Sequence, residues 1–331
     1  MKKMLSPWLT GATLALATQA AQALDEITVA YFLEWPMPFL AAKAAGTYEE
    51  ELGININWRS FETGTAMSAA MAAGDVQISV SQGVPPFVVA ASAGQDIQVV
   101  DVAVSYSDND NCVVHADLEI DKDSADELAG KKVAVPLGTA AHYGFLRQMN
   151  HFGIDLASLE VVNMAPPEGA AALAQKAVDF ACGYGGGLTR MKEHGNVLLT
   201  GDEKEALGIL VFDVTSAPAD FIAENEELLA DFLRITAEAN AQWNASDEAM
   251  LAAIAQESGM DLAAAQAAIA TMTFPSAEEQ LSEKWLGGNA QTFMKGVADV
   301  FVEAGSIDGA LETYENAVNA APLTAAAAAV E

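Results

Sequence analysis

Strand patterns and helical patterns alternate along the first two thirds of the chain. Ile27-Thr28-Val29-Ala30-Tyr31-Phe32 has the composition of a β-strand, and a helical pattern follows from Phe39 to about Leu52, ending at Gly53. Further strand patterns occupy Val76–Val80 and Ile97–Val104. Strands that alternate with helices at intervals of roughly 10–15 residues are typical of parallel sheets covered by helices. The sequence therefore predicts an α/β fold with a mainly parallel sheet.

A second series of the same kind begins near Cys112. It contains the strand pattern Lys132–Val135, a helical pattern from about Ala141 to His151, and the strand pattern Val178–Cys182. A chain of 331 residues with two such series has the length for two domains or for one two-lobed body.

The composition changes after about Asp220, where the sequence becomes acidic and rich in alanine. Helices are expected from Glu226 to Ser246, from Asp247 to Ser258 and from Ser276 to Ala304. The alanine-rich end, Ala320–Val330, has low complexity, and we expect it to be a frayed tail.

The first 23 residues match an export signal. Two lysines precede an apolar run from Met4 to Ala17, and Ala21-Gln22-Ala23 supplies the small residues of a cleavage site. The run is too short, and too interrupted by Pro7 and Gly11, to favour a membrane anchor. We predict a signal peptide over residues 1–23, cleavage between Ala23 and Leu24, and a mature protein in the periplasm.

The acidic balance excludes some partners. The chain has 46 acidic residues against 15 lysines and arginines, a formal charge of −31, so a footprint on nucleic acid or anionic lipid is not expected. With 52% apolar residues the chain is not disordered, and the charge is interpreted mainly as a solvated surface. A preference for cationic ligands is the alternative.

The two cysteines, Cys112 and Cys182, are candidates for one disulfide in an exported chain. The alternative is a pair of reduced, buried thiols. No CxxC or HExxH pattern occurs, so neither a metal site nor a cofactor is predicted.

Catalytic motifs are incomplete. Ser79-Val80-Ser81-Gln82-Gly83 lacks the first glycine of a nucleophile elbow, and Gly183-Tyr184-Gly185-Gly186-Gly187-Leu188 has leucine where a dinucleotide motif needs its third glycine. The four histidines show no ligand or triad spacing. We predict that the protein is not an enzyme.

Polar residues and glycines instead mark two places where a strand ends and a helix begins. Ser81-Gln82-Gly83 precedes a helix that starts near Pro85, and Gly138-Thr139-Ala140-Ala141-His142-Tyr143 opens another. Ligands of open α/β sheets bind at such ends, and helix N-termini there hold anions. The alternative for Ser81 and Thr139 is ordinary helix capping.

Four segments, in this order, match a known family. They are Ile27–Tyr31, Gly74-Asp75-Val76-Gln77-Ile78, Leu128–Pro136 and Ala177-Val178-Asp179-Phe180-Ala181. Over about residues 25–245 the sequence resembles the periplasmic substrate-binding proteins of ABC importers for taurine and related sulfonates, within a wider group that includes nitrate- and pyrimidine-binding members.

The resemblance implies a type II periplasmic binding protein, in which two α/β lobes joined by two crossing segments close on a ligand. It further implies a monomer that delivers its ligand to a membrane ABC permease. The expected division is residues 24–107 for the first lobe, 108–212 for the second, and 213–331 for a return to the first lobe plus C-terminal helices.

The resemblance also implies a ligand site. The sulfonate would lie at the helix starts that contain Ser81, Gln82, Thr139, Ala140, His142 and Tyr143. The ammonium would meet Asp213, because a zwitterion needs N–H donors at one end and a carboxylate at the other.

Two features depart from the family pattern. Where the family usually has aromatic-x-Pro, this chain has Tyr184-Gly185-Gly186, so Tyr184 replaces the aromatic wall without the rigid proline. Cys182 is likewise not a general feature of the family. In the first loop, Glu34 and Trp35 add an acid and an indole. Trp35 is predicted to join an aromatic box for a methylated cation, whose other rings are Tyr31, Phe32, Tyr143 and Tyr184. In the alternative interpretation Tyr31 and Phe32 belong partly to the core, and Trp35 lies on the surface of a lobe.

The leading hypothesis is capture of taurine or a close sulfonate. A second hypothesis is a quaternary-ammonium or sulfonium zwitterion, or an amino-acid-like osmolyte, whose cation Glu34, Trp35 and Asp213 would hold. A third, of another class, is a pyrimidine-synthesising enzyme on the same fold. The export signal and the absence of a histidine- and cysteine-rich metal site in the sequence oppose it.

Overall fold

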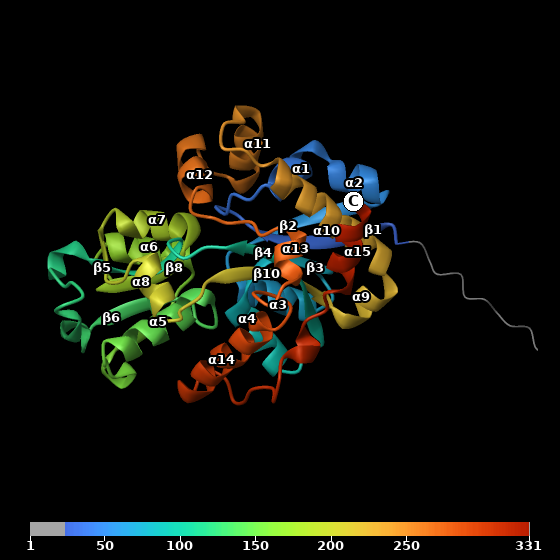
Figure 1. Ribbon diagram of the computed structural model, residues 1–331. Coiled ribbons are helices and arrows are strands. Elements are labelled where there is room, and N and C mark those ends of the chain that lie inside the picture. The colour runs from blue at the N-terminus through green and yellow to red at the C-terminus, as the bar shows by residue number, and fades with distance from the viewer. Residues whose placement is uncertain (1–23, 331) are drawn as a thin grey trace, which may run out of the picture.

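The computed structural model describes residues 24–330. It shows two lobes, each built around one sheet of five strands with helices on both faces (Figure 1). The predicted signal peptide lies outside the described residues, and its cleavage site stays a prediction.

The sheet of the first lobe has the order β2-β1-β3-β10-β4. Its strands are β1 (Glu26–Phe32), β2 (Asn55–Phe61), β3 (Ile78–Gly83), β4 (Ile97–Ser105) and β10 (Phe212–Pro218). Strand β10 is antiparallel to both of its neighbours, and the other four strands run in one direction. The chain leaves this lobe after β4 and returns to it through β10.

The sheet of the second lobe has the equivalent order β7-β6-β8-β5-β9. Its strands are β5 (Asp110–His115), β6 (Lys132–Val135), β7 (Glu160–Asn163), β8 (Phe180–Tyr184) and β9 (Gly195–Val197). Here β5, the strand that enters the lobe, is antiparallel to its two neighbours. Both sheets therefore confirm the predicted α/β class with mainly parallel strands.

Helices follow the strands much as the alternation predicts. In the first lobe they are α1 (Phe39–Ala45), α2 (Thr47–Leu52), α3 (Gly64–Ala72) and α4 (Val84–Ser92), and in the second α5 (Ala140–His151), α6 (Pro166–Ala174), α7 (Gly185–Lys192) and α8 (Gly201–Ala206). The single helix expected over Phe39–Leu52 is two helices. Gly46 has a φ of 72°, a left-handed conformation that ends α1 and separates it from α2.

The C-terminal helices differ from expectation in two places. They are α9 (Ala219–Glu224), α10 (Glu226–Gln242), α11 (Glu248–Ser258), α12 (Leu262–Ile269), α13 (Ala277–Leu281), α14 (Asn289–Glu303) and α15 (Ala321–Val330). The helix expected over Ser276–Ala304 is divided into α13 and α14. The turn between them contains Gly287 and Gly288, and Gly288 has a φ of 153°.

The expectation of a frayed tail is wrong. Helix α15 packs against α10, with Leu323 and Ala326 buried. Just before it, the Asn319 N–H donates to the Val99 carbonyl of the edge strand β4 at 2.8 Å. Alanine has the highest helix propensity, and its small side chain lets two helices approach, so an alanine-rich segment folds where a partner surface is present.

Two segments connect the lobes. One is residues 106–109, between β4 and β5, and the other runs from β9 to β10 and contains α8. Lys204 of α8 fastens them together, because its buried ammonium donates to the Ser107 carbonyl at 2.8 Å and also to the Asp110 carbonyl. The Gly201 N–H donates to the Asp108 carboxylate at 2.7 Å.

Candidate functional site

A small chamber lies between the two lobes, where the parallel strands end. We call it the chamber and define it by its lining residues: Phe32, Trp35, Gly64, Gly83, Pro86, Tyr106, Thr139, Ala140, Tyr184 and Asp213. They come from the ends of β1, β3 and β8, the loop after β1, the starts of α3 and α5, the first turn of α4, the first crossing segment and β10. The free volume is about 10 Å³, the space of one water molecule.

Asp213 is the charged residue of the chamber lining. It is 1% exposed, and its carboxylate accepts hydrogen bonds from the Tyr106 hydroxyl at 2.5 Å and the Ser81 hydroxyl at 2.7 Å. Burial raises the pKa of Asp213 to about 7, although both hydroxyl donors lower it. Among the described residues no lysine, arginine or histidine forms an ion pair with it. The carboxylate is therefore stabilised by neutral donors and has no protein cation beside it.

Ser81 and Trp35 extend this hydrogen-bond network. The Trp35 indole N–H donates to the Ser81 hydroxyl at 2.9 Å, and Ser81 donates in turn to Asp213. Ser81 has a φ of 60°, a left-handed conformation that costs a residue other than glycine of the order of 1 kcal/mol or more. Backbone strain of this kind is concentrated at functional sites, where the surrounding contacts hold the residue in place.

Aromatic rings surround the carboxylate. The Trp35 ring meets Tyr106 edge-on at 4.6 Å between centroids and Tyr184 at 6.4 Å, and Phe32 lies 6.1 Å from Tyr184. Trp35 is 3% exposed, so its interpretation as a surface residue is wrong. Tyr31, by contrast, packs edge-on against Trp58, away from these rings, and belongs to the core of the first lobe.

The start of α5 supplies hydrogen-bond donors, in contrast to the Asp213 carboxylate, which accepts hydrogen bonds. Thr139 and Ala140 line the chamber, and the Thr139 hydroxyl donates to the Pro136 carbonyl at 2.6 Å. Helix α5 consequently has no side-chain cap, and its first-turn N–H groups stay available for an acceptor. Helix α4 offers fewer donors, because Pro85 and Pro86 have no N–H.

Three residues expected at the helix starts have other contacts. The Gln82 side chain points into the first lobe, where it donates to the Gly64 carbonyl at 2.8 Å and accepts from Ser216 at 3.1 Å. The His142 ring stacks on Phe301 of α14 at 5.2 Å. Burial lowers the pKa of His142 to about 4, so the ring is neutral at pH 7.

Tyr143 also faces α14. Its ring meets Phe293 edge-on at 5.7 Å, and its hydroxyl accepts from Arg147 at 2.6 Å. Gln82, His142 and Tyr143 therefore do not line the chamber. His142 and Tyr143 join the second lobe to a C-terminal helix of the first.

Glu34 lies in a second, larger pocket of about 450 Å³, which we call the mouth pocket. Its lining includes Glu34, Gly186 and Arg190, and it shares Phe32, Trp35 and Tyr184 with the chamber. The Glu34 carboxylate is held by Arg190 in two hydrogen bonds of 2.7 and 2.9 Å. The structure thus brings Trp35, Thr139, Ala140, Tyr184 and Asp213 together, with Ser81 behind Asp213, and places Glu34 beside them.

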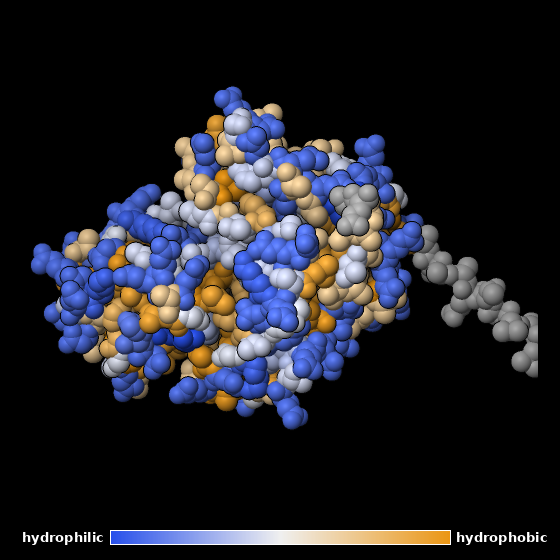
Figure 2. All heavy atoms as spheres, viewed as in Figure 1, coloured by the Kyte–Doolittle hydropathy of each residue, from blue (hydrophilic) through white to orange (hydrophobic). Residues whose placement is uncertain are grey.

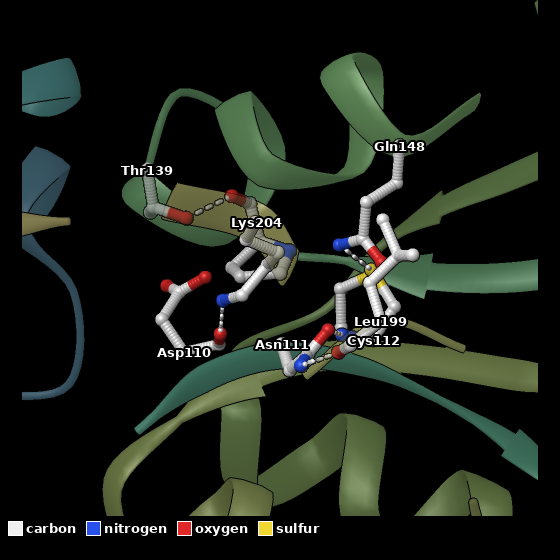
Figure 3. Close-up of a disulfide and its surroundings, with 9 residues drawn as sticks. Asp110, Asn111, Cys112, Thr139, Gln148, Leu199 and Lys204 are labelled. Atoms are coloured by element: carbon white, nitrogen blue, oxygen red, sulfur yellow. Dashed lines mark hydrogen bonds between the residues drawn. A yellow bond between two sulfur atoms is a disulfide. The ribbon is translucent and has the colours of Figure 1, made fainter. Parts of the chain in front are cut away.

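Asp110, the first residue of β5, is a candidate that the sequence analysis missed. It is buried, one of its carboxylate oxygens has no hydrogen-bond partner among the described residues, and burial raises its pKa to about 6 while Lys204 lowers it. Its side chain points toward the Thr139 end of α5 (Figure 3). Asp110 is close enough to raise the pKa of Asp213 through charge repulsion.

Topology was the signal that could have found Asp110. An antiparallel strand begins at the edge where the parallel strands end, so its first residues face the cleft. Asp213 is the second residue of β10 and Asp110 the first of β5, and both strands are the antiparallel members of their sheets. Tyr106 lies on the first crossing segment directly after the carboxyl end of β4, and that position was the signal that could have found it.

The sequence profile described as NMT1/THI5 like matches residues 36–250. The chain belongs to the NMT1/THI5-like family. The taurine-binding periplasmic protein of Escherichia coli (strain K12) is 30% identical over 240 residues, which are 72% of this chain and 73% of that protein. The family resemblance inferred from the sequence is thereby confirmed.

Solved structures of this fold agree. The aliphatic sulphonate-binding protein SsuA of Escherichia coli superposes with a TM-score of 0.70 at 19% identity, over 88% of this chain and 96% of that one. The nitrate-binding protein NrtA of Synechocystis PCC 6803 gives 0.70 at 13% identity, over 94% and 90%. At these identities the likeness establishes the periplasmic binding protein fold alone. The relatives are binding proteins, in agreement with the prediction that this family member is not an enzyme.

The predicted disulfide is present in this family member. Cys112 of β5 and Cys182 of β8 are bonded, and the two residues lie directly opposite each other in the strand register. In the same register Asp110 lies opposite Tyr184. The disulfide therefore joins the two strands whose ends carry these residues (Figure 3).

Hydrophilic residues cover much of the visible face of both lobes, in accord with the acidic composition (Figure 2). Between residues 24 and 330, no group of three or more His, Cys, Asp and Glu side chains is arranged to hold a metal ion. Over the same range, no helix has the length and apolarity needed to cross a bilayer.

Proposed function

We propose that the protein is the solute-binding component of an ABC importer, which captures taurine or a related small sulfonate zwitterion in the periplasm. The observation that carries this proposal is the buried Asp213 carboxylate, which faces the chamber without a protein cation. A ligand ammonium would supply the missing charge. The relationship to the taurine-binding protein of Escherichia coli supports the same ligand class.

The two ends of such a ligand have matching partners. The ammonium would lie beside Asp213, with the Asp110 carboxylate nearby, and the sulfonate would accept hydrogen bonds from the N–H groups at the start of α5. Because the chamber has room for one water molecule, we expect the lobes to separate to admit the ligand and the lining to adjust around it. The protein is expected to act as a monomer and to present the closed lobes to its permease.

A methylated cation is the second candidate. Trp35, Tyr106 and Tyr184 lie around Asp213, and aromatic faces attract quaternary ammonium groups. Such a cation donates no N–H hydrogen bond, so it would depend on the rings rather than on the two aspartates.

The test is calorimetric titration of ligand-free protein with taurine, isethionate, glycine betaine and nitrate. Taurine binding with none by isethionate, which carries a hydroxyl in place of the ammonium, supports the proposal. Binding of betaine alone transfers the function to the second candidate, and binding of nitrate or isethionate in preference to taurine contradicts both.

The matched variants are Asp213→Asn and Asp101→Asn. Both replace a buried carboxylate of the first lobe, but Asp101 hydrogen-bonds to the Thr215 N–H at 3.1 Å and does not line the chamber. Taurine affinity should fall about 100-fold in Asp213→Asn, because a charge-assisted contact is lost, and stay unchanged in Asp101→Asn. Equal affinities in the two variants would remove Asp213 from the site.

A further inference from the structure

Two contacts join the lobes around the mouth pocket. Glu34, in the loop after β1 of the first lobe, forms a two-pronged ion pair with Arg190 of α7 in the second lobe. Beside it, the Tyr184 hydroxyl donates to the Glu62 carbonyl of the first lobe at 3.1 Å. Both contacts run from one lobe to the other, so separation of the lobes would break them.

The first lobe holds Glu34 ready for this contact. Its φ is 55°, and its N–H donates to the Ser258 carbonyl at the end of α11 at 2.7 Å. The next residue, Trp35, is buried and hydrogen-bonded to Ser81. One peptide unit therefore connects the ion pair at the mouth to the hydrogen-bond network of Asp213.

The start of α7 has no side chain where the lobes meet. A Cβ placed on Gly186 would lie 2.5 Å from a carboxylate oxygen of Glu34, and one placed on Gly185 would lie 2.9 Å from the Glu34 carbonyl. Both distances are shorter than van der Waals contact. Closure on Glu34 therefore requires glycine at Gly186, whereas separated lobes would not. Gly185 has a φ of 57°, which favours glycine in either arrangement.

We propose that Glu34 and Arg190 form a clasp that closes the mouth pocket over the chamber, and that Gly186 admits Glu34 to it. Glu34 and Arg190 are positioning residues, because they act on the lifetime of the closed state and touch each other rather than the ligand. The proposal rests on the proposed function in one respect, that a ligand is enclosed when the lobes close. Release of the ligand then requires the ion pair to break.

Stopped-flow measurement of taurine dissociation, followed by tryptophan fluorescence, tests the clasp. Glu34→Gln and Arg190→Gln should each raise the dissociation rate about fivefold at low salt, the magnitude of a well-formed surface ion pair, with little change in the association rate. The double variant should release taurine no faster than either single variant, because the second change removes a partner of a contact already lost. Unchanged dissociation rates, or additive effects, would overturn the clasp.

Gly186→Ala tests whether closure of the lobes can be impaired without a loss of thermal stability. Gly186 lies in the first turn of α7 without a left-handed φ, so alanine suits the helix while its Cβ meets Glu34. The control is Gly296→Ala in α14, where a Cβ would meet nothing within 4 Å. Both variants should unfold at or above the wild-type temperature, and only Gly186→Ala should release taurine faster. Equal rates in the two variants would contradict the proposal.

If the wild-type protein binds none of the four probes, the proposed function fails and the clasp is tested without ligand. Small-angle X-ray scattering then compares the radius of gyration of Gly186→Ala and Glu34→Gln with that of wild type and Gly296→Ala. A larger radius in the first pair supports the clasp. The same radius in all four proteins overturns it.

Discussion

The two lobes have equivalent strand orders, and in each the antiparallel strand begins with a buried aspartate near the chamber. Asp213 of the first lobe accepts two hydroxyl donors and has no cation beside it. Asp110 of the second lobe has Lys204 nearby, yet one of its oxygens has no hydrogen-bond partner among the described residues. The same topology thus places one carboxylate of each lobe near the chamber, but the groups around the two carboxylates differ.

This difference separates two roles. The network around Asp213 orients a carboxylate toward the chamber, where an ammonium can lie. The Lys204 ammonium lies near the Asp110 carboxylate and donates hydrogen bonds to the Ser107 and Asp110 carbonyls. Asp110 is therefore part of the junction between the lobes. Position in the sheet decides which residues reach the cleft, and local donors decide what each of them does there.

The largest expected effect concerns the second lobe alone. Replacing Cys112 and Cys182 together by alanine should lower its free energy of unfolding by about 4 kcal/mol, because the crosslink restricts a loop of about 70 residues in the unfolded chain. Hydrogen exchange resolved by segment should show the loss in β5–β9 and not in β1–β3. A uniform loss in both lobes would show that they unfold as one unit.

Lys204→Met should cost about 3 kcal/mol of stability, because it leaves Asp110 buried without its cation. Urea unfolding measures the change. The matched control is Lys122→Met, which removes an exposed ion pair with Glu203 at 2.8 Å in the same lobe and should change stability by less than about 1 kcal/mol. If both variants lose a similar free energy of unfolding, Lys204 does not stabilise the junction between the lobes.

Asp110→Asn tests how much each of the two aspartates contributes to taurine affinity. Taurine affinity should fall about tenfold, less than in Asp213→Asn, because Asp110 attracts the ammonium without lining the chamber. The free energy of unfolding should fall by less than in Lys204→Met, because the Lys204 ammonium keeps its hydrogen bonds to the Ser107 and Asp110 carbonyls. If affinity falls as far as in Asp213→Asn, the two carboxylates hold the ammonium jointly.

The pH dependence of taurine affinity distinguishes Asp213 from Asp110, and it is the smallest of the expected effects. Both pKa values are raised above those of a free aspartate, so each group binds a proton as the pH falls through about 7 for Asp213 and about 6 for Asp110. Taurine affinity should be level above about pH 8, fall about twofold between pH 8 and 7 and about tenfold between pH 7 and 6, and fall more steeply below, because the ammonium needs ionised carboxylates. Calorimetry at several pH values should show a fall of no more than about twofold between pH 7 and 6 in Asp213→Asn, because only Asp110 still titrates there.

The ligand-free protein should show the opposite trend in stability. An aspartate whose pKa is raised on folding destabilises the folded state at high pH, and this destabilisation disappears as the pH falls through the folded pKa toward the unfolded value. The ligand-free wild type should therefore gain stability relative to Asp213→Asn between pH 7 and 5, as measured by urea unfolding. A constant difference would contradict the raised pKa.

The sequence predicted the sheets, the disulfide pair and several chamber residues because each leaves a local pattern. Apolar runs mark strands, and Asp213 follows an apolar segment that the family resemblance had aligned. The directions of neighbouring side chains leave no such pattern. Glu34 and Trp35 are adjacent in sequence, but a left-handed residue at the turn sends one to Arg190 and the other to Ser81.

Tertiary contacts account for the remaining differences. His142 and Tyr143 follow Thr139 in the same helix, yet they face α14, whose position no pattern in α5 reveals. The alanine-rich end has the composition of a disordered tail, and the surface of α10 that orders it lies some 90 residues earlier in the chain. Asp110 was missed because its place at the cleft depends on the direction of a strand.

The insertion of β10 between β3 and β4 also governs the order in which the protein can assemble. The second lobe is one continuous stretch of chain, so all of its strands are present once β9 has been synthesised. The first lobe still lacks β10 at that moment, and β3 and β4 have no partner between them until residue 218 is available. Synthesis begins at the amino terminus, so the second lobe can fold first. The first lobe can complete its sheet only when the last third of the polypeptide is present.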